Sequence, residues 1–107
     1  MECSEHWIFE LLKLRYFISV IEPLYYPIPQ ISIITLLYDE SGIVVSSSAS
    51  LEYNSWYCKA GGIYTNANSG ERYRVTGSHY VTYPVGYTPS QAVYNTSTSW
   101  YQIPWFF

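Results

Sequence analysis

Residues 70–89, GERYRVTGSHYVTYPVGYTP, alternate between two kinds of position with a period of two. This period is typical of a β-strand, in which successive side chains point to opposite faces of the sheet. One face would hold Tyr73, Val75, Gly77, His79, Val81 and Tyr83. The other would hold Arg72, Arg74, Thr76, Ser78, Tyr80 and Thr82. Because only the first face suits a core, the segment predicts a strand of an antiparallel sheet with one face in water.

The pattern elsewhere after residue 30 also predicts short strands, rich in β-branched and aromatic residues. These are ISIITLLY (31–38), IVVSS (43–47), ASLEYNSWYC (49–58), QAVYNTS (91–97) and SWYQI (99–103). We expect DESG at 39–42 to turn the first two into a hairpin. We expect KAGG at 59–62 and NANSG at 66–70 to break the chain between strands. Five or six strands at this spacing predict a small, mainly β protein, an antiparallel β-sandwich.

The segment SEHWIFELLKLRYFISVIEP, residues 4–23, allows two interpretations. As a helix it would begin at an N-cap Ser4 and stop at Pro23. Its apolar stripe would be Trp7, Leu11, Leu14, Ile18 and Ile21. As a strand it would direct to one face Leu12, Leu14, Tyr16, Ile18 and Val20. We favour a short N-terminal helix, with an additional strand as the alternative.

The following segment EPLYYPIPQ, residues 22–30, carries three prolines and predicts a stiff, extended connector. We therefore divide the chain into two parts. Residues 1–30 form the N-terminal helix or strand with its connector, and residues 31–107 form the β-sandwich domain.

The composition changes the range of possible partners. The 107 residues are 20% aromatic and only 12% charged, with 13 tyrosines and a net charge of −3. Direct binding of nucleic acid is not expected, because it requires a basic stripe. Residues 1–40 carry an excess of acids, namely Glu2, Glu5, Glu10, Glu22, Asp39 and Glu40 against Lys13 and Arg15. An acidic front of this kind could meet a partner with a basic surface.

The N-terminal segment does not predict export or membrane insertion. Positive residues do not lead it, and Glu10, Lys13 and Arg15 interrupt its apolar run. From these residues we expect a soluble, unexported chain with no membrane contact. The two cysteines, Cys3 and Cys58, permit at most one disulfide and leave the redox compartment open.

The strand at Tyr73, Arg74, Val75, Gly77 and His79, with Trp56 on an earlier strand, resembles a known group of domains. These are the uncharacterised secreted Ig-like β-sandwich domains of Gram-positive gut bacteria, and the resemblance covers about residues 33–103. It implies a small all-β fold and an extracellular location. It implies no known activity, so no functional residue is carried over. Residues 1–30 depart from the family pattern.

Catalysis and metal binding receive little support from the residue pattern, so we expect no enzyme and no cofactor. His79 lies in mid-strand beside apolar residues, and the chain has one aspartate and no GxSxG motif. We interpret His79 as a half-buried structural residue. Cys3, His6, Cys58 and His79 would make a set suited to tetrahedral zinc, but only the first two are closely spaced. We expect instead a free, buried Cys58 and an exposed Cys3, with no metal.

The aromatic residues suggest two kinds of ligand. Sugar rings could stack on Trp56, Tyr80, Tyr87 and Trp100. A protein partner could instead dock on the polar face of strand 70–83, because interfaces favour Tyr, Trp and Arg. The residues that we expect to bind such a partner are Arg72, Arg74, Tyr80, Tyr87, Trp105, Phe106 and Phe107. We expect Trp100 to lie in the core.

From the sequence we therefore expect a non-catalytic binding module whose ligand is another protein. One alternative is a small inhibitor of the kind that phages and mobile elements encode, blocking a host enzyme such as a nuclease. A surface glycan-binding domain is the other alternative.

Overall fold

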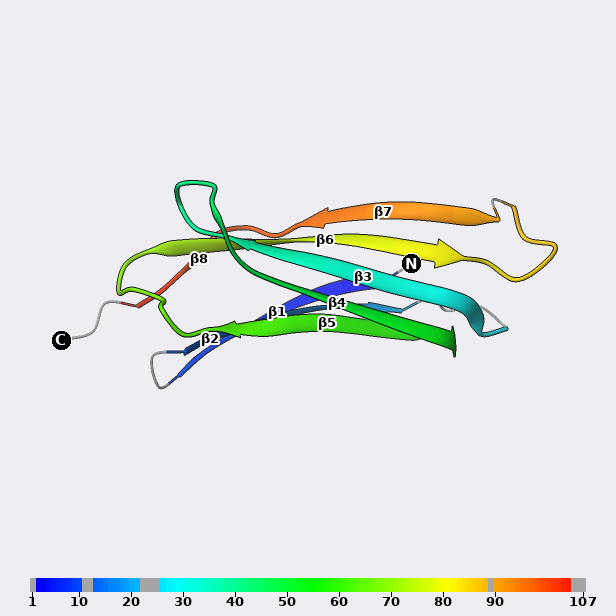
Figure 1. Cartoon of the computed structure of the whole chain (residues 1–107), viewed down its shortest axis with the longest axis horizontal. Helices are drawn as coiled ribbons and strands as arrows, with labels where there is room; N and C mark the ends of the chain where they lie inside the picture. Colours follow the sequence, from blue (N-terminus) through cyan, green and yellow to red (C-terminus); the bar gives the residue numbers. More distant parts are fainter. Residues whose placement is uncertain (1, 11–12, 22–25, 89, 105–107) are drawn as a thin grey trace.

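The computed structural model describes residues 2–10, 13–21, 26–88 and 90–104, and all regular structure in them is β (Figure 1). The strands are β1 (Glu2–Glu10), β2 (Lys13–Ile21), β3 (Ile28–Tyr38), β4 (Val44–Ser55), β5 (Tyr57–Tyr64), β6 (Arg72–Thr82), β7 (Gln91–Ser97) and β8 (Tyr101–Gln102). In these ranges no helix occurs that is long and apolar enough to cross a membrane. The predicted mainly β fold is confirmed.

Two antiparallel sheets pack face to face in a layer arrangement 57 Å long (Figure 1). The three-stranded sheet has the order β1-β2-β5. The five-stranded sheet has the order β4-β3-β6-β7, and β8 pairs with the beginning of β6. β4 and β5 follow each other in sequence but lie in different sheets, so the chain changes sheet at a corner around Trp56. Asn54, just before this corner, has a φ of 50°.

The favoured N-terminal helix is wrong, because residues 2–10 and 13–21 form the hairpin β1–β2. β2 also pairs with β5, so residues 14–21 have a neighbouring strand on both sides. The strand interpretation holds for its inward face, where Leu14, Tyr16, Ile18 and Val20 are buried. Leu14 and Ile18 lie on the apolar face in both the helix and the strand interpretation. The spacing of these residues therefore could not distinguish the two.

The predicted hairpin at DESG is confirmed as β3–β4. Asp39 explains the turn, because its Oδ1 accepts hydrogen bonds from the backbone N–H of Ser41 at 2.9 Å and of Ile43 at 3.0 Å. Gly42 supplies the left-handed φ of 83° that the turn requires. The NANSG break is also confirmed, since β5 ends at Tyr64 and β6 begins at Arg72.

The predicted break at KAGG is wrong, because residues 59–62 lie inside β5. β5 is paired along its whole length with β2, and Gly61 faces Phe17. A Cβ on Gly61 would collide with the backbone oxygen of Tyr16 and with the Cβ of Phe17. Glycine here permits the close approach of two strands and does not mark a turn.

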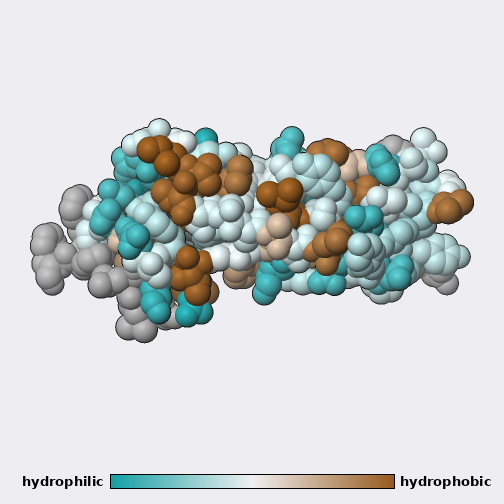
Figure 2. Space-filling model, in the orientation of Figure 1, coloured by the Kyte–Doolittle hydropathy of each residue, from teal (hydrophilic) through white to brown (hydrophobic). Residues whose placement is uncertain are grey.

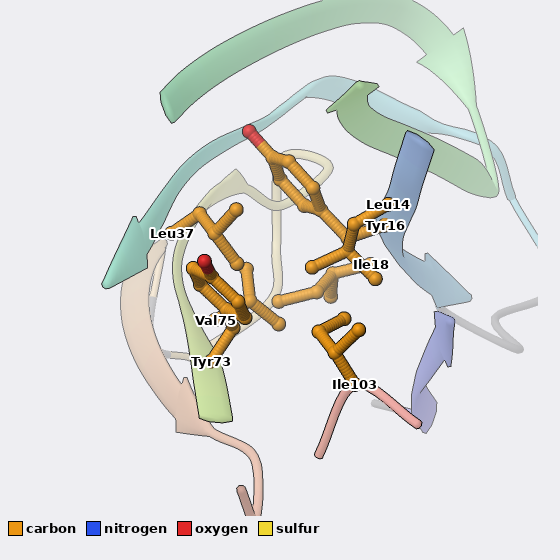
Figure 3. Packing of buried hydrophobic residues seen from close by; sticks show 7 residues of the cluster. All are labelled: Leu14, Tyr16, Ile18, Leu37, Tyr73, Val75 and Ile103. Carbon is orange, nitrogen blue, oxygen red and sulfur yellow. The ribbon is translucent and has the colours of Figure 1, made fainter. Parts of the chain in front are cut away.

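Between the sheets the apolar side chains form two clusters. The first contains Leu14, Tyr16, Ile18, Leu37, Tyr73, Val75 and Ile103 (Figure 3). The second contains Val20, Ile28, Ile31, Ile33, Cys58, Ala60 and Val81. Hydroxyl groups pair at the boundary between the core and β4. The Oη of Tyr16 lies 2.7 Å from the Oγ of Ser46 on β4. Thr35 is fully buried and bonds to the Ser48 side chain.

Candidate functional site

The two faces of β6 are as predicted. Tyr73, Val75, His79 and Val81 are buried between the sheets. On the outer face Arg72 and Tyr80 are exposed, and Arg74 is partly buried. Because β6 lies second from one edge of the five-stranded sheet, these residues stand on a broad face rather than on a rim.

A row of exposed side chains crosses this outer face where Tyr80 lies. The strand register places Leu51, Ser32, Tyr80 and Val93 side by side on β4, β3, β6 and β7. Leu51, Tyr80 and Val93 are 46%, 43% and 59% exposed. Ile34, diagonal to Leu51 and Tyr80, is also exposed. We call Ile34, Leu51, Tyr80 and Val93 the apolar row.

Two shallow hollows flank the apolar row. One, of about 260 Å³, is lined by Gln30, Tyr80, Val81, Thr82, Gln91, Ala92 and Val93. The other, of about 360 Å³, is lined by Gln30, Ser32, Ile33, Ile34, Ala49, Ser50 and Leu51. Gln30 lines both, so the hollows lie on either side of β3 and could receive neighbouring side chains of one ligand.

At the other end of the face, two guanidinium groups lie against one indole ring. Arg72 and Arg74 are 5.5 Å and 5.2 Å from the ring of Trp100. Arg74 also lies 5.7 Å from the ring of Tyr38. Glu40 holds Arg72 in place, with its Oε1 3.7 Å from the guanidinium Nε and 2.7 Å from the backbone nitrogen. The predicted core position of Trp100 is wrong, since the residue is 40% exposed and packs on the arginines.

Of the predicted protein-binding residues, Arg72, Arg74 and Tyr80 share the outer face of β6, where they form two separate groups. Arg74 and Tyr80 are six residues apart on β6, about 20 Å along an extended strand. Tyr87 lies beyond the end of β6, where its ring stacks on Tyr83 at 6.4 Å. Trp105, Phe106 and Phe107 lie outside the described residues.

The expected glycan-stacking aromatics are exposed, as such a role requires, but they do not gather. Trp56 lies at the sheet-changing corner, Tyr80 in the apolar row and Trp100 on the arginines. On the side of the molecule that Figure 2 shows, the exposed apolar residues form several separate patches. A ligand that uses these rings together would have to span much of the molecule.

His79 is fully buried, which is deeper than predicted, and it contacts two polar groups. Its Nε2 lies 2.9 Å from Thr96 Oγ1 and 3.7 Å from Cys3 Sγ. Its Nδ1 is buried without a hydrogen-bond partner in the described part of the chain. Burial lowers the pKa of His79, so the neutral imidazole is favoured.

Of the other members of the considered zinc set, Cys3 contacts His79, but Cys58 and His6 lie elsewhere. Cys58 is buried in the second core cluster, and burial raises the pKa of its thiol. His6 stacks on Phe17 at a ring distance of 4.5 Å, on the outer face of the three-stranded sheet. Within the described ranges no three Cys, His, Asp or Glu side chains come together as metal ligands would. The partly buried Cys3 is less exposed than predicted.

The acids of the first forty residues are partly engaged within the fold. Asp39 bonds to its own turn and Glu40 pairs with Arg72. Glu5 is exposed on β1. The side chains of Glu2, Glu10 and Glu22 lie outside the described residues, so the described part of the expected acidic front consists of Glu5, Asp39 and Glu40.

Ile34, Leu51 and Val93 were missed as candidate binding residues. In ISIITLLY both faces of the strand read as apolar, so Ile34 resembled a core position. Leu51 and Val93 are single apolar residues among polar ones, which is an ordinary surface pattern. Only the register between strands shows that they stand beside Tyr80.

Comparison of the chain with the models of known protein families, with curated proteins and with solved structures finds no match. The geometry of the outer face is therefore the basis for a functional proposal.

Proposed function

We propose that this chain is a non-catalytic binding module that docks a protein partner on the outer face of its five-stranded sheet. The apolar row is the observation that carries the proposal. Its members come from four adjacent strands, so they form a surface that the fold holds rigid. Apolar residues grouped in this way on a sheet face are typical of an interaction site.

The other end of the same face carries arginine and tryptophan side chains, which are common in protein interfaces. Arg72, Arg74 and Trp100 belong to the residue types that contribute most to binding energy. Their mutual packing fixes the guanidinium groups before a partner arrives, which reduces the ordering cost of association. A suitable partner would present apolar side chains to the apolar row and a carboxylate or carbonyl group to the arginines.

The test is capture on the immobilised chain from extracts of producing cells and of candidate hosts, followed by measurement of affinity for the purified partner. Tyr80→Lys should weaken that affinity by about thirtyfold or more, as loss of a central aromatic anchor does. Val85→Lys is the matched control, because Val85 is fully exposed in the turn after β6 and lies outside the apolar row. It should leave the affinity unchanged.

Two results contradict the proposal. One is that no protein is retained by the wild-type chain. The other is a partner that Tyr80→Lys binds as tightly as the wild type.

One feature of the same face favours a glycan ligand as a second candidate function. The hollow beside Tyr80 joins an aromatic ring to the side chains of Gln30 and Gln91. A ring and two amides are suited to the apolar face and the hydroxyl groups of a sugar. A glycan array with Gln30→Ala and Gln91→Ala separates the candidates, since both changes should abolish sugar binding but have little effect on a protein that uses the apolar row.

A further inference from the structure

β7 forms one edge of the five-stranded sheet, and its outer side is unpaired in the described part of the chain (Figure 1). Proteins usually protect such edges with charged residues, prolines or bulges, because free backbone groups recruit other strands. β7, with the sequence QAVYNTS, contains no charge and no proline. Its seven residues pair with β6 without a register shift.

The other strands that end a sheet differ from β7 in this respect. β1 carries Glu5, β4 carries Glu52 and β5 carries Lys59. A charge on an edge strand opposes pairing with an identical strand, because the same charge approaches from the other side. Among β1, β4, β5 and β7, the strands at the ends of the two sheet orders, β7 is thus the one that lacks this protection.

Two flanking hydrogen bonds fix which backbone groups of β7 point outward. The N–H of Tyr83 donates to the carbonyl of Ser90, and that of Thr98 donates to the carbonyl of Val75. Both pairs continue the β6–β7 register, in which hydrogen-bonded and non-bonded pairs alternate. The even-numbered residues of β7 therefore bond to β6. The backbone groups that face away from the sheet are those of Gln91, Val93, Asn95 and Ser97.

We propose that β7 pairs antiparallel with β7 of a second copy of this chain, across a two-fold axis at Tyr94. In this register Val93 faces Asn95 of the second copy, and Gln91 faces Ser97 of the second copy. The outward N–H and C=O groups then exchange about eight hydrogen bonds, two for each bonded pair. The sheets of both copies become one continuous sheet.

A second copy fits this edge because the pairing is self-complementary. Tyr94 would face Tyr94 of the second copy at a non-bonded position, where side chains are closest and aromatic pairs are favourable. No charge meets a like charge along the shared strand. Val93, which is 59% exposed, would lose part of its contact with water. This inference does not depend on the proposed function, since the dimer forms through the edge and the partner binds to the face.

The test is sedimentation velocity of the full chain across a dilution series, combined with amide hydrogen exchange. The wild type should form a dimer that dissociates on dilution. In the dimer the amides of Val93 and Asn95 should be protected along with the inward amide of Tyr94. Asn95→Lys places a charge on the shared edge and should raise the dissociation constant about tenfold or more. It should also expose the amide of Val93 to exchange while that of Tyr94 stays protected.

Tyr80→Lys is the matched control, because it adds the same charge on the neighbouring strand of the same sheet. It should leave the dimer intact while it weakens binding of a protein partner, so failure of this inference and failure of the proposed function can be told apart. A wild type that remains monomeric overturns the inference. So does a dimer that Asn95→Lys leaves unchanged, or one in which the amide of Val93 exchanges freely.

Discussion

At the scale of single residues, His79 shows how a buried polar group constrains this fold. The side chain is fully buried and its ring nitrogen Nε2 contacts Thr96 on β7 and Cys3 on β1. A charged imidazolium there would lose its hydration, and no described carboxylate bonds to the ring. The neutral form is therefore the one that the fold accommodates.

This burial predicts that stability falls in mild acid. The pKa of His79 is lowered from its usual 6.5 in the folded chain, so below that pH the unfolded chain binds a proton that the folded chain does not. The free energy of unfolding therefore has its full value above pH 6.5 with respect to His79. It falls as the pH falls below 6.5, by up to about 1.4 kcal/mol per pH unit. Urea unfolding at a series of pH values down to about pH 5, above the usual carboxylate range, would measure it.

His79→Gln serves as the comparison, because its amide can bond to Thr96 without titrating. The stability of this variant should not show the fall below pH 6.5 that is due to His79. Parallel stability curves for the two proteins across this range would show that His79 does not carry the effect.

At the scale of strands, the pairing of β2 with β5 depends on Gly61. Gly61→Ala should destabilise the protein by about 1–3 kcal/mol, since the added Cβ meets backbone that cannot yield. Gly62→Ala is the control, because its Cβ would lie 3.1 Å from the hydroxyl tip of Tyr16 and no backbone atom is among its nearest neighbours. Chemical denaturation should show the smaller cost for Gly62→Ala. Equal costs would mean that the close approach at Gly61 relaxes freely.

The pattern predicted the elements whose own residues carry a clear signal, either a turn sequence or a strict alternation. β3 and β4 form a hairpin around DESG, and the alternation of β6 correctly separates its buried and exposed faces. β2 and β5 are partners far apart in sequence, so the glycines of β5 resembled a turn until Phe17 was known to face them. The helix expected at residues 4–23 was wrong for the same reason, since pairing of β2 on both sides outweighs a helical apolar stripe.

The candidate site was predictable only strand by strand. Arg72, Arg74 and Tyr80 were correctly assigned to the outer face of β6 from period two alone. Which residues stand beside them depends on the register of other strands. That is why Leu51 and Val93 were missed and why Trp100 was placed in the core rather than on the arginines.

At the scale of the whole molecule, both core clusters draw on both sheets. β2 supplies Leu14, Tyr16 and Ile18 to one cluster and Val20 to the other. Removal of residues 1–30 should therefore leave residues 31–107 unfolded, as judged by circular dichroism and by loss of a cooperative thermal transition. The four side chains contribute about 1.5–3 kcal/mol each, a sum comparable with the whole stability of a small domain.

A truncated chain that still melts cooperatively would contradict this expectation. It would also show that the five-stranded sheet is an independent folding unit. A matched control is the truncated chain mixed with a peptide of residues 1–30, which should restore the transition if the hairpin β1–β2 is the missing part.

The pairing of β2 with β5 has a consequence for synthesis of the chain on the ribosome. The hairpin β1–β2 is translated before β5, the second partner of β2, which ends only at Tyr64. At ordinary translation rates the nascent hairpin waits for a few seconds with the apolar side of β2 uncovered. During that interval it is a natural substrate for chaperones, and slowing translation between the two strands should increase its misfolding.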